Sequence, residues 1–465
     1  MNSLRQRKDL CSVSAMMNCR SRNSKRPLSA TGLALALIAV ALLVTGCSSK
    51  VVSKTPAAII EKPKPPTSVP MWLGNAERMF FGTGPWKDGV LTVKWEFETD
   101  FITGRLHKDL WGGTSWPGQP SISDDRVYFP SAGGTLYCLN KNDGSVIWTF
   151  KAKDSFKATP AIFGDKIIAS GLDHHVYCLN ARDGSVVWVY ETGFEVDGST
   201  IMVDGRVYFG SEDRNFYCLN FADGSLIYKV PVGSVEGSIT MKDGRIYLGT
   251  EQGELYCLDP ADGRTIWKSK IGADSDSTPA VINGFVYTAA EDGVVRSYRQ
   301  DTGELVWSFV TDGGHTGFAN EHIGIWASPI VVKNRVYIGG SNHYLYCLSA
   351  DKGELIWKYK ARGPIWGTSP VVDGRVVFGD KAGWLHLLSA DDGKLISELK
   401  IGDNINSTPA VLDGRIYIGA FNGKLYCLEM APAVNQPTPT PPPPQKRKPR
   451  LRRKVPALSD YDYNS

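Results

Sequence analysis

Residues 243–267 read DGRIYLGTEQGELYCLDPADGRTIW, and this phrase occurs, with small variations, seven times along the chain. The residue that ends each copy recurs in steps of 40, 40, 39, 40, 50 and 40 residues. An eighth copy, from Asp413 to Leu428, stops before its Trp. A repeat of this period indicates one supersecondary unit per copy. The seven terminal positions are Trp148, Trp188, Tyr228, Trp267, Trp307, Trp357 and Ser397.

Each copy contains several short runs of β-branched and aromatic residues, separated by Asp-Gly pairs that favour hairpin turns. Four such strands fit one propeller blade, whereas a helical repeat needs apolar residues at a spacing of 3.6. The sequence therefore predicts an all-β, eight-bladed propeller. Val93–Phe97 resembles a last blade strand without the rest of its blade. We expect this N-terminal strand to complete the eighth blade and close the ring.

The repeat resembles the pyrroloquinoline-quinone (PQQ) type of propeller repeat over residues 71–430, including the segment Gly74–Arg78 and Trp86. This resemblance implies the propeller fold. Its functional implication is broader, because the same repeat occurs in quinoprotein dehydrogenases, in BamB-type lipoproteins of outer-membrane β-barrel assembly and in other exported propellers.

The N-terminal region has the features of a lipoprotein signal peptide. Residues 33–45 form an apolar run too short to span a bilayer, with basic residues before it. The run leads into Val44–Cys47, which resembles the bacterial lipobox and makes Cys47 the expected lipidation site. Ser48 after the Cys favours the outer membrane by the same resemblance. We expect residues 1–46 to be the signal peptide, with Met16 or Met17 as alternative starts, and residues 47–70 to be a lipid-anchored flexible tether.

Residues 431–465 form a Pro-rich and basic tail that we expect to be disordered. Seven of the nine residues from Lys446 to Lys454 are Lys or Arg. This run is either a solvated tail or a contact to an anionic polymer. The chain carries +4 overall, of which residues 1–46 hold +6 and the tail holds +5, so residues 47–430 carry −7. An acidic propeller argues against nucleic-acid binding.

The nine cysteines are not arranged as a disulfide framework. Cys11 and Cys19 belong to the signal peptide, and six others occupy one position of the repeat. Equivalent positions of neighbouring blades lie too far apart for a bridge, so we expect these six to be small buried fillers. The repeated Trp is expected to pack between blades, anchored by its indole N–H. The six fillers are Cys138, Cys178, Cys218, Cys257, Cys347 and Cys427.

A candidate site emerges where the repeats differ, in the loops that lead into the first strand of each blade. We compared the blades at the position three residues before the Pro slot of the repeat. This position predicts an acidic arc opposite an aromatic arc. Such a pair of arcs suits a cationic or sugar-like ligand, or a protein loop with basic anchors. Trp111 and Trp116 are further candidates for the aromatic arc, and Glu195 and Asp274 extend the acidic arc. In blade order the position holds Pro117, Lys157, Asp197, Glu236, Asp276, Trp326, Trp366 and Asn406.

Asp274-Ser-Asp276-Ser-Thr-Pro279 is similar to the loop by which BamB-type proteins dock on a POTRA domain of the barrel-assembly protein. The resemblance implies that Asp274 and Asp276 contact a partner. Val232–Glu236 replaces the family's Leu-x-Leu-Arg segment, which is a departure from that docking mode. A function as a glycan- or ligand-binding adaptor of the cell envelope stays open.

A PQQ-dependent dehydrogenase fits less well, because the sequence has no Cys-Cys pair and lacks long insertions. His315 and His322, in the insertion of residues 311–324, do not have a recognised metal-ligand spacing. We therefore expect a non-catalytic protein without cofactor or metal.

Overall fold

The computed structural model describes residues 68–103, 110–112, 118–314 and 323–432. Predictions that concern residues 1–46, Cys47, Trp116, the two histidines of the insertion and residues 433–465 lie outside this part. No helix within the described residues is long and apolar enough to cross a membrane. One short helical turn, the 3-10 helix η1 (Trp72–Gly74), is present among them.

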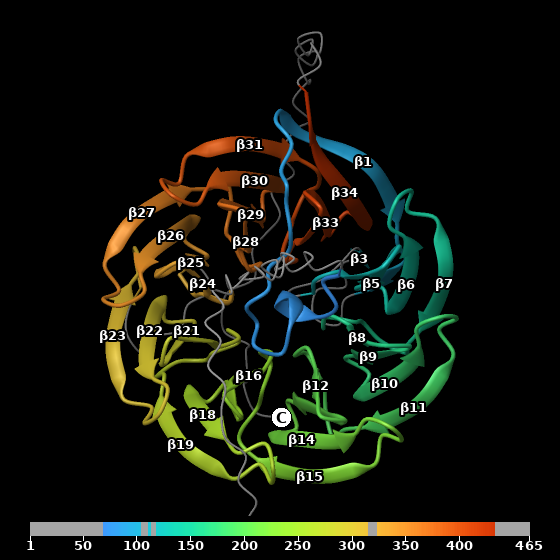
Figure 1. Ribbon diagram of the computed structural model, residues 1–465, viewed down its shortest axis with the longest axis vertical. Coiled ribbons are helices and arrows are strands. Elements are labelled where there is room, and N and C mark those ends of the chain that lie inside the picture. The colour runs from blue at the N-terminus through green and yellow to red at the C-terminus, as the bar shows by residue number, and fades with distance from the viewer. Residues whose placement is uncertain (1–67, 104–109, 113–117, 315–322, 433–465) are drawn as a thin grey trace, which may run out of the picture. The chain divides into compact units, whose positions relative to one another are not determined.

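Eight antiparallel four-stranded sheets form a ring, which confirms the predicted eight-bladed propeller (Figure 1). In blades 1 to 4 the strands are β4 (Ser121–Ser123), β5 (Arg126–Pro130), β6 (Thr135–Asn140) and β7 (Val146–Lys151); β8 (Ala161–Phe163), β9 (Lys166–Ser170), β10 (His175–Asn180) and β11 (Val186–Glu191); β12 (Ile201–Val203), β13 (Arg206–Gly210), β14 (Asn215–Asn220) and β15 (Leu226–Pro231); and β16 (Thr240–Lys242), β17 (Arg245–Gly249), β18 (Glu254–Leu258) and β19 (Thr265–Lys270).

Blades 5 to 8 continue the same order around the ring. Their strands are β20 (Ala280–Ile282), β21 (Phe285–Ala289), β22 (Val294–Arg299) and β23 (Leu305–Val310); β24 (Ile330–Val332), β25 (Arg335–Gly339), β26 (Tyr344–Ser349) and β27 (Leu355–Lys360); β28 (Val371–Val372), β29 (Arg375–Gly379), β30 (Trp384–Ser389) and β31 (Leu395–Lys400); and β32 (Ala410–Leu412), β33 (Arg415–Ala420), β34 (Lys424–Ala431) and β1 (Val90–Glu98).

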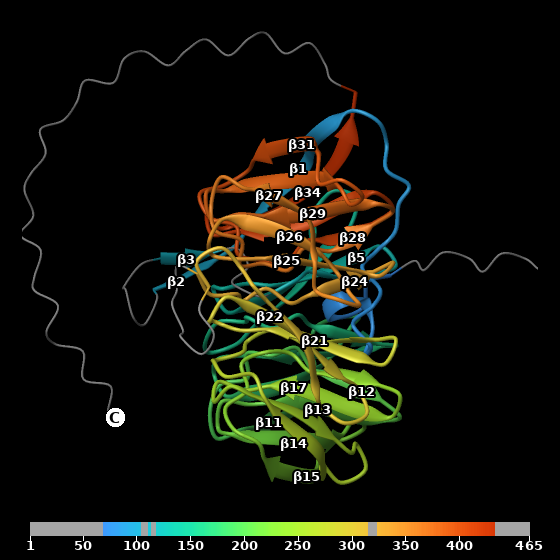
Figure 2. The same cartoon turned by 90° about the vertical axis from the view of Figure 1, so that its left-hand side faces the viewer.

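Strand β1 closes the ring as the sequence predicts, because it pairs antiparallel with β34 from Val90↔Ala431 to Glu98↔Lys424. The strand is longer than the predicted segment of residues 93–97. After β1, a separate hairpin of β2 (Phe101–Thr103) and β3 (Leu110–Gly112) precedes blade 1. Figure 2 shows this hairpin projecting from one side of the disk.

The Trp position joins each blade to the next one. The indole N–H of Trp148 donates to the carbonyl of Ala181 at 3.1 Å, and Trp188, Trp267, Trp307 and Trp357 make the equivalent bond to the following blade. Each indole also covers a turn of that blade at a glycine that has a positive φ and leaves no room for a side chain. The predicted packing role of the repeated Trp is confirmed.

Residues 69–82 cross the centre of the ring before β1 begins (Figure 1). Val69 forms a β-bridge with Ile122 of blade 1, two residues before the expected start of the domain. The buried guanidinium of Arg78 donates to the carbonyls of Trp72, Ser199 and Ile239. This segment therefore connects blades on opposite sides of the ring.

The six repeated cysteines are free and buried, as predicted. Each stands opposite the Trp position of its blade, as in the pair Cys257↔Trp267, so a small residue makes room for a large one. Burial raises the pKa of the Cys257 thiol to about 11, which disfavours the reactive thiolate.

We expect these thiols to react with Ellman's reagent at least about 100-fold more slowly in the native protein than in the guanidinium-unfolded chain. A stopped-flow or manual-mixing absorbance assay checks this, with the unfolded chain as the control. Labelling of all six native thiols at the unfolded rate would contradict the buried filler role.

Candidate functional site

The inter-blade loops run from the last strand of one blade to the first strand of the next. Hydrogen bonds to Ser and Thr hydroxyl groups join neighbouring loops around the ring. In six blades the Ser or Thr two residues after the predicted site position accepts a backbone N–H from the same position of an adjacent blade. These hydrogen bonds include Thr159 N to Ser199 Oγ at 2.9 Å, Ser199 N to Ser238 Oγ at 2.8 Å, Thr278 N to Ser328 Oγ at 2.9 Å, Ser328 N to Thr368 Oγ1 at 3.0 Å and Thr368 N to Thr408 Oγ1 at 3.0 Å.

A second set of loops, the inner turns between the second and third strands of each blade, adds three carboxylates to the site. The backbone N–H of Glu212 donates to the carbonyl of Glu195 at 3.0 Å, and that of Glu291 donates to Asp274 at 2.9 Å. Glu251 makes the equivalent bond to Ser234 at 3.1 Å. Each inner turn is thereby fixed beside the inter-blade loop of its own blade.

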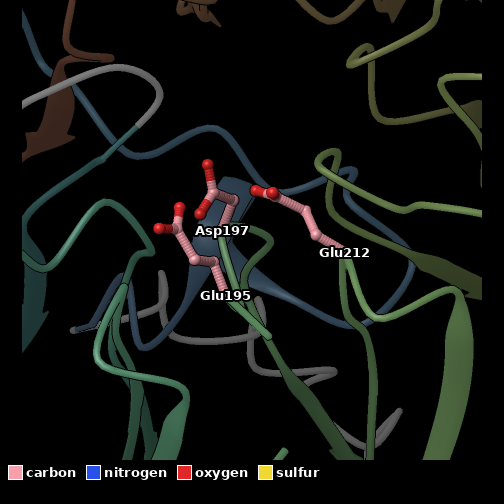
Figure 3. A group of neighbouring side chains, drawn as sticks. All are labelled: Glu195, Asp197 and Glu212. Carbon is pink, nitrogen blue, oxygen red and sulfur yellow. The ribbon is translucent and has the colours of Figure 1, made fainter. Parts of the chain in front are cut away.

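Together the two sets of loops form a cluster that we call the acidic mouth. Carboxylate oxygens of Glu195, Asp197 and Glu212 lie within 4.8 Å of one another, and so do those of Glu212, Glu236 and Glu251. Figure 3 shows the first three carboxylates turned toward one another. The acidic mouth consists of Glu195, Asp197, Glu212, Glu236, Glu251, Asp274, Asp276 and Glu291.

Lys157 is the cation that the structure places against the acidic mouth, through an ion pair with Asp197 Oδ2. Burial opposes its charge, but the attraction of Asp197 and Glu236 raises the pKa of Lys157 above its usual range. Asp197 is fully buried, and Asp276 is only 6% exposed. The Oδ1 atoms of these two residues have no hydrogen-bond partner among the described residues.

Several carboxylates of the mouth have raised pKa values and so resist ionisation. Burial, followed by repulsion from Asp197 and Glu236, raises the pKa of Glu212 to about 9. Burial and the charge of Asp197 raise the pKa of Glu236 to about 8. The pKa of Asp274 rises to about 7, through burial and repulsion from Glu291 and Glu251. Burial also raises the pKa of Asp276 well above its usual value. The site therefore favours ligands that bring positive charge.

The two tryptophans of the predicted aromatic arc form an indole pair, with ring centroids 4.5 Å apart for Trp326 and Trp366. Both are half-buried. Trp326 Nε1 donates to Glu291 at 2.7 Å, and Trp366 Nε1 donates to Ser341 Oγ at 2.8 Å. The ammonium of Lys381 lies 3.1 Å from the centroid of the Trp366 ring. The indole pair thus adjoins the end of the acidic mouth.

The structure brings together Asp197, Glu236 and Asp276 with Glu195 and Asp274, as the repeat alignment implies. Asp276 lies beneath the surface, whereas Asp274 is half-buried. Glu212, Glu251 and Glu291 are not predicted from the sequence, because they lie in the inner turns and not at the aligned position of the inter-blade loops. The signal was present at one position of the inner turns, which aligns 40 residues apart in most blades. In blade order this position holds Ala132, Leu172, Glu212, Glu251, Glu291, Ser341, Lys381 and Phe421.

Residues 121–430 match the family described as beta-alanine-activating enzyme, beta-propeller. The chain belongs to this β-propeller family. The match spans all eight blades apart from the closing strand β1. A comparison with curated proteins finds no match.

Solved structures with similar folds include BamB and two dehydrogenases. BamB from Moraxella catarrhalis is 18% identical with a TM-score of 0.50, covering 75% of this chain and 95% of that one. A europium-containing methanol dehydrogenase is 12% identical with a TM-score of 0.63, covering 79% and 99%. The quinohemoprotein alcohol dehydrogenase from Comamonas testosteroni is 13% identical with a TM-score of 0.64, covering 80% and 82%. At these identities the likeness establishes the PQQ-type propeller fold alone.

Proposed function

We propose that this protein is a non-catalytic lipoprotein of the bacterial cell envelope that binds another protein through the acidic mouth, in a BamB-like role in outer-membrane β-barrel assembly. The lipobox-like sequence around Cys47 supports an outer-membrane anchor facing the periplasm. The partner is then a POTRA-bearing barrel-assembly protein. The charge of the basic tail suits contact with an anionic polymer of the envelope.

The observation that carries this proposal is the acidic mouth itself. Eight carboxylates from six loops form it, and Lys157 pairs with one of them. The buried Oδ1 atoms of Asp197, Asp274 and Asp276 have no hydrogen-bond partner among the described residues. Such a surface attracts a protein segment with Lys or Arg anchors and holds it by charge-assisted hydrogen bonds. Asp274 and Glu291 are half-buried, so a partner can reach them, whereas Asp197 and Asp276 are buried.

The Asp274-Ser-Asp276 loop supports the BamB-like role more specifically, because it resembles the docking loop of that family. The burial of Asp276 refines the proposal. We assign the direct contact to Asp274, and we assign Asp276 a supporting role beneath it. Glu291 extends the docking surface toward the indole pair through its bond with Trp326.

A glycan- or ligand-binding adaptor is the second candidate, and the indole pair favours it. Flat aromatic faces beside carboxylates suit a sugar or an organic cation. A PQQ-dependent dehydrogenase is the third candidate, because two of the similar folds are dehydrogenases. It predicts tight binding of the quinone and dye reduction by the loaded protein.

The test measures binding of the purified POTRA domains to the full chain by isothermal titration calorimetry. We expect the double variant Asp274→Asn/Glu291→Gln to lose at least about ten-fold in affinity, since two charged contacts are removed. Native binding should also weaken with added salt.

Asp351→Asn/Glu354→Gln is the matched control, because it removes one exposed aspartate and one exposed glutamate from blade 6. Equal losses in both double variants would contradict a specific docking surface. Absence of binding by the native protein would reject the assembly role. A glycan array that responds to Trp326→Ala/Trp366→Ala, but not to the acidic variant, would support the adaptor instead.

A further inference from the structure

One side of the acidic mouth has the arrangement of a cation site. Glu195 and Asp197 come from the loop into blade 3, and Glu212 comes from the inner turn of the same blade. Their oxygens lie within 4.8 Å of one another, as Figure 3 shows for the three side chains. Glu212 is shared with a second group, formed with Glu236 and Glu251 of blade 4.

A second, independent observation points to a ligand at this place. Asp197 is fully buried, and its Oδ1 atom has no hydrogen-bond partner among the described residues. Asp276, 6% exposed, also has an Oδ1 atom without a partner in that part of the chain. A buried carboxylate oxygen that has lost its water and gained no donor is unfavourable. Lys157 pairs with the other oxygen of Asp197, so it does not satisfy Oδ1.

The donor chemistry selects a hard divalent cation. All donors are carboxylate oxygens, which suit calcium and magnesium rather than soft transition metals. Calcium accepts carboxylate oxygens in a flexible geometry, whereas magnesium demands near-ideal octahedral geometry and keeps several waters. Three carboxylates from two loops therefore fit calcium with less movement.

We propose that Glu195, Asp197 and Glu212 bind a calcium ion at the acidic mouth. The ion cross-links the inter-blade loop of residues 192–200 to the inner turn of residues 211–214, which a backbone hydrogen bond from Glu212 to Glu195 already holds together. This site lies in the blade 3 part of the acidic mouth, whereas the proposed partner contacts Asp274 and Glu291 belong to blade 5.

The experiment titrates calcium chloride into the chelator-stripped full chain by calorimetry and follows the melting temperature in parallel. We expect one-site binding and a rise in melting temperature. Glu212→Gln should weaken the affinity by at least about ten-fold, because it removes a ligand charge. Glu354→Gln, an exposed glutamate of blade 6, should bind like the native protein. Magnesium chloride should bind more weakly than calcium.

Glu212→Gln is expected to fold, since it removes one of several repelling charges. Circular dichroism without calcium checks the folding of this variant. If it does not fold, Glu195→Gln replaces it in the calcium titration. No heat and no melting shift at about 1 mM calcium would overturn the proposal, because even weak extracellular sites bind in that range. The proposal is also overturned if both glutamine variants at the site keep native affinity, or if magnesium binds as tightly as calcium.

Discussion

Replacing Trp95 with alanine should lower the free energy of unfolding by about 3–5 kcal/mol, the usual cost of deleting a buried Trp side chain. Trp95 lies on the closing strand β1 and is only 9% exposed. It fills the Trp position of blade 8, where its indole N–H donates to Lys141 of blade 1 at 3.2 Å. Its ring packs 6.0 Å from that of Tyr417 and covers the turn at Gly144. Urea denaturation followed by circular dichroism measures the loss.

The control for this prediction is Val93→Ala on the same strand, because Val93 is 42% exposed. Its expected cost is within about 0.5 kcal/mol. The two variants share the strand and differ in whether the side chain joins blade 8 to blade 1. A loss at Trp95 no larger than that at Val93 would show that β1 does not close the ring in solution.

The closing strand also shows why so much of the fold could be predicted. Each blade repeats the same strand and turn pattern. The last repeat therefore visibly lacks a strand after Leu428, and the segment around Trp95 is visible as one extra strand at the start. The Cys and Trp positions face each other in every blade that has both, and their packing follows from periodicity alone. Ser397 departs from this rule because its hydroxyl accepts the backbone N–H of Leu91 on β1.

The candidate site was predicted only in part, since it depends on contacts between different loops. The repeat alignment places Asp197, Glu236 and Asp276 at equivalent positions and so predicts that they are neighbours. It does not reveal that Glu212 and Glu251 approach from the inner turns, because those turns lie some 15 residues further along the chain. The burial of Asp276 and the hydrogen bond from Trp326 to Glu291 likewise depend on the packing between loops, which the repeat pattern does not specify.

Raising the pH from about 5 to about 9 in the presence of a chelator should destabilise the protein through the acidic mouth. The pKa of Glu212 is raised to about 9 and that of Glu236 to about 8, from an ordinary value of 4.5, with burial as the largest cause of each. Between these values the folded protein binds more protons than the unfolded chain, so the stability present at low pH is lost as the pH rises. The charged groups that face Glu212 are Lys157, Glu195, Asp197, Glu236 and Glu251.

A pKa shift of one unit corresponds to about 1.4 kcal/mol of stability. Glu212 and Glu236 are partly exposed, so solvent screening reduces their combined effect, and we expect the free energy of unfolding to fall by about 2–3 kcal/mol. Glu212→Gln isolates the part of the effect that involves Glu212, including its repulsion with Asp197 and Glu236, because more distant groups titrate equally in both proteins. The variant should gain stability relative to the native protein as the pH rises, whereas Glu354→Gln should follow the native curve. Urea denaturation at each pH gives the difference. The difference in the free energy of unfolding between Glu212→Gln and the native protein could instead stay constant from pH 5 to 9. Glu212 would then already be ionised at low pH, and a cation or a basic partner would gain nothing by reducing repulsion among the carboxylates.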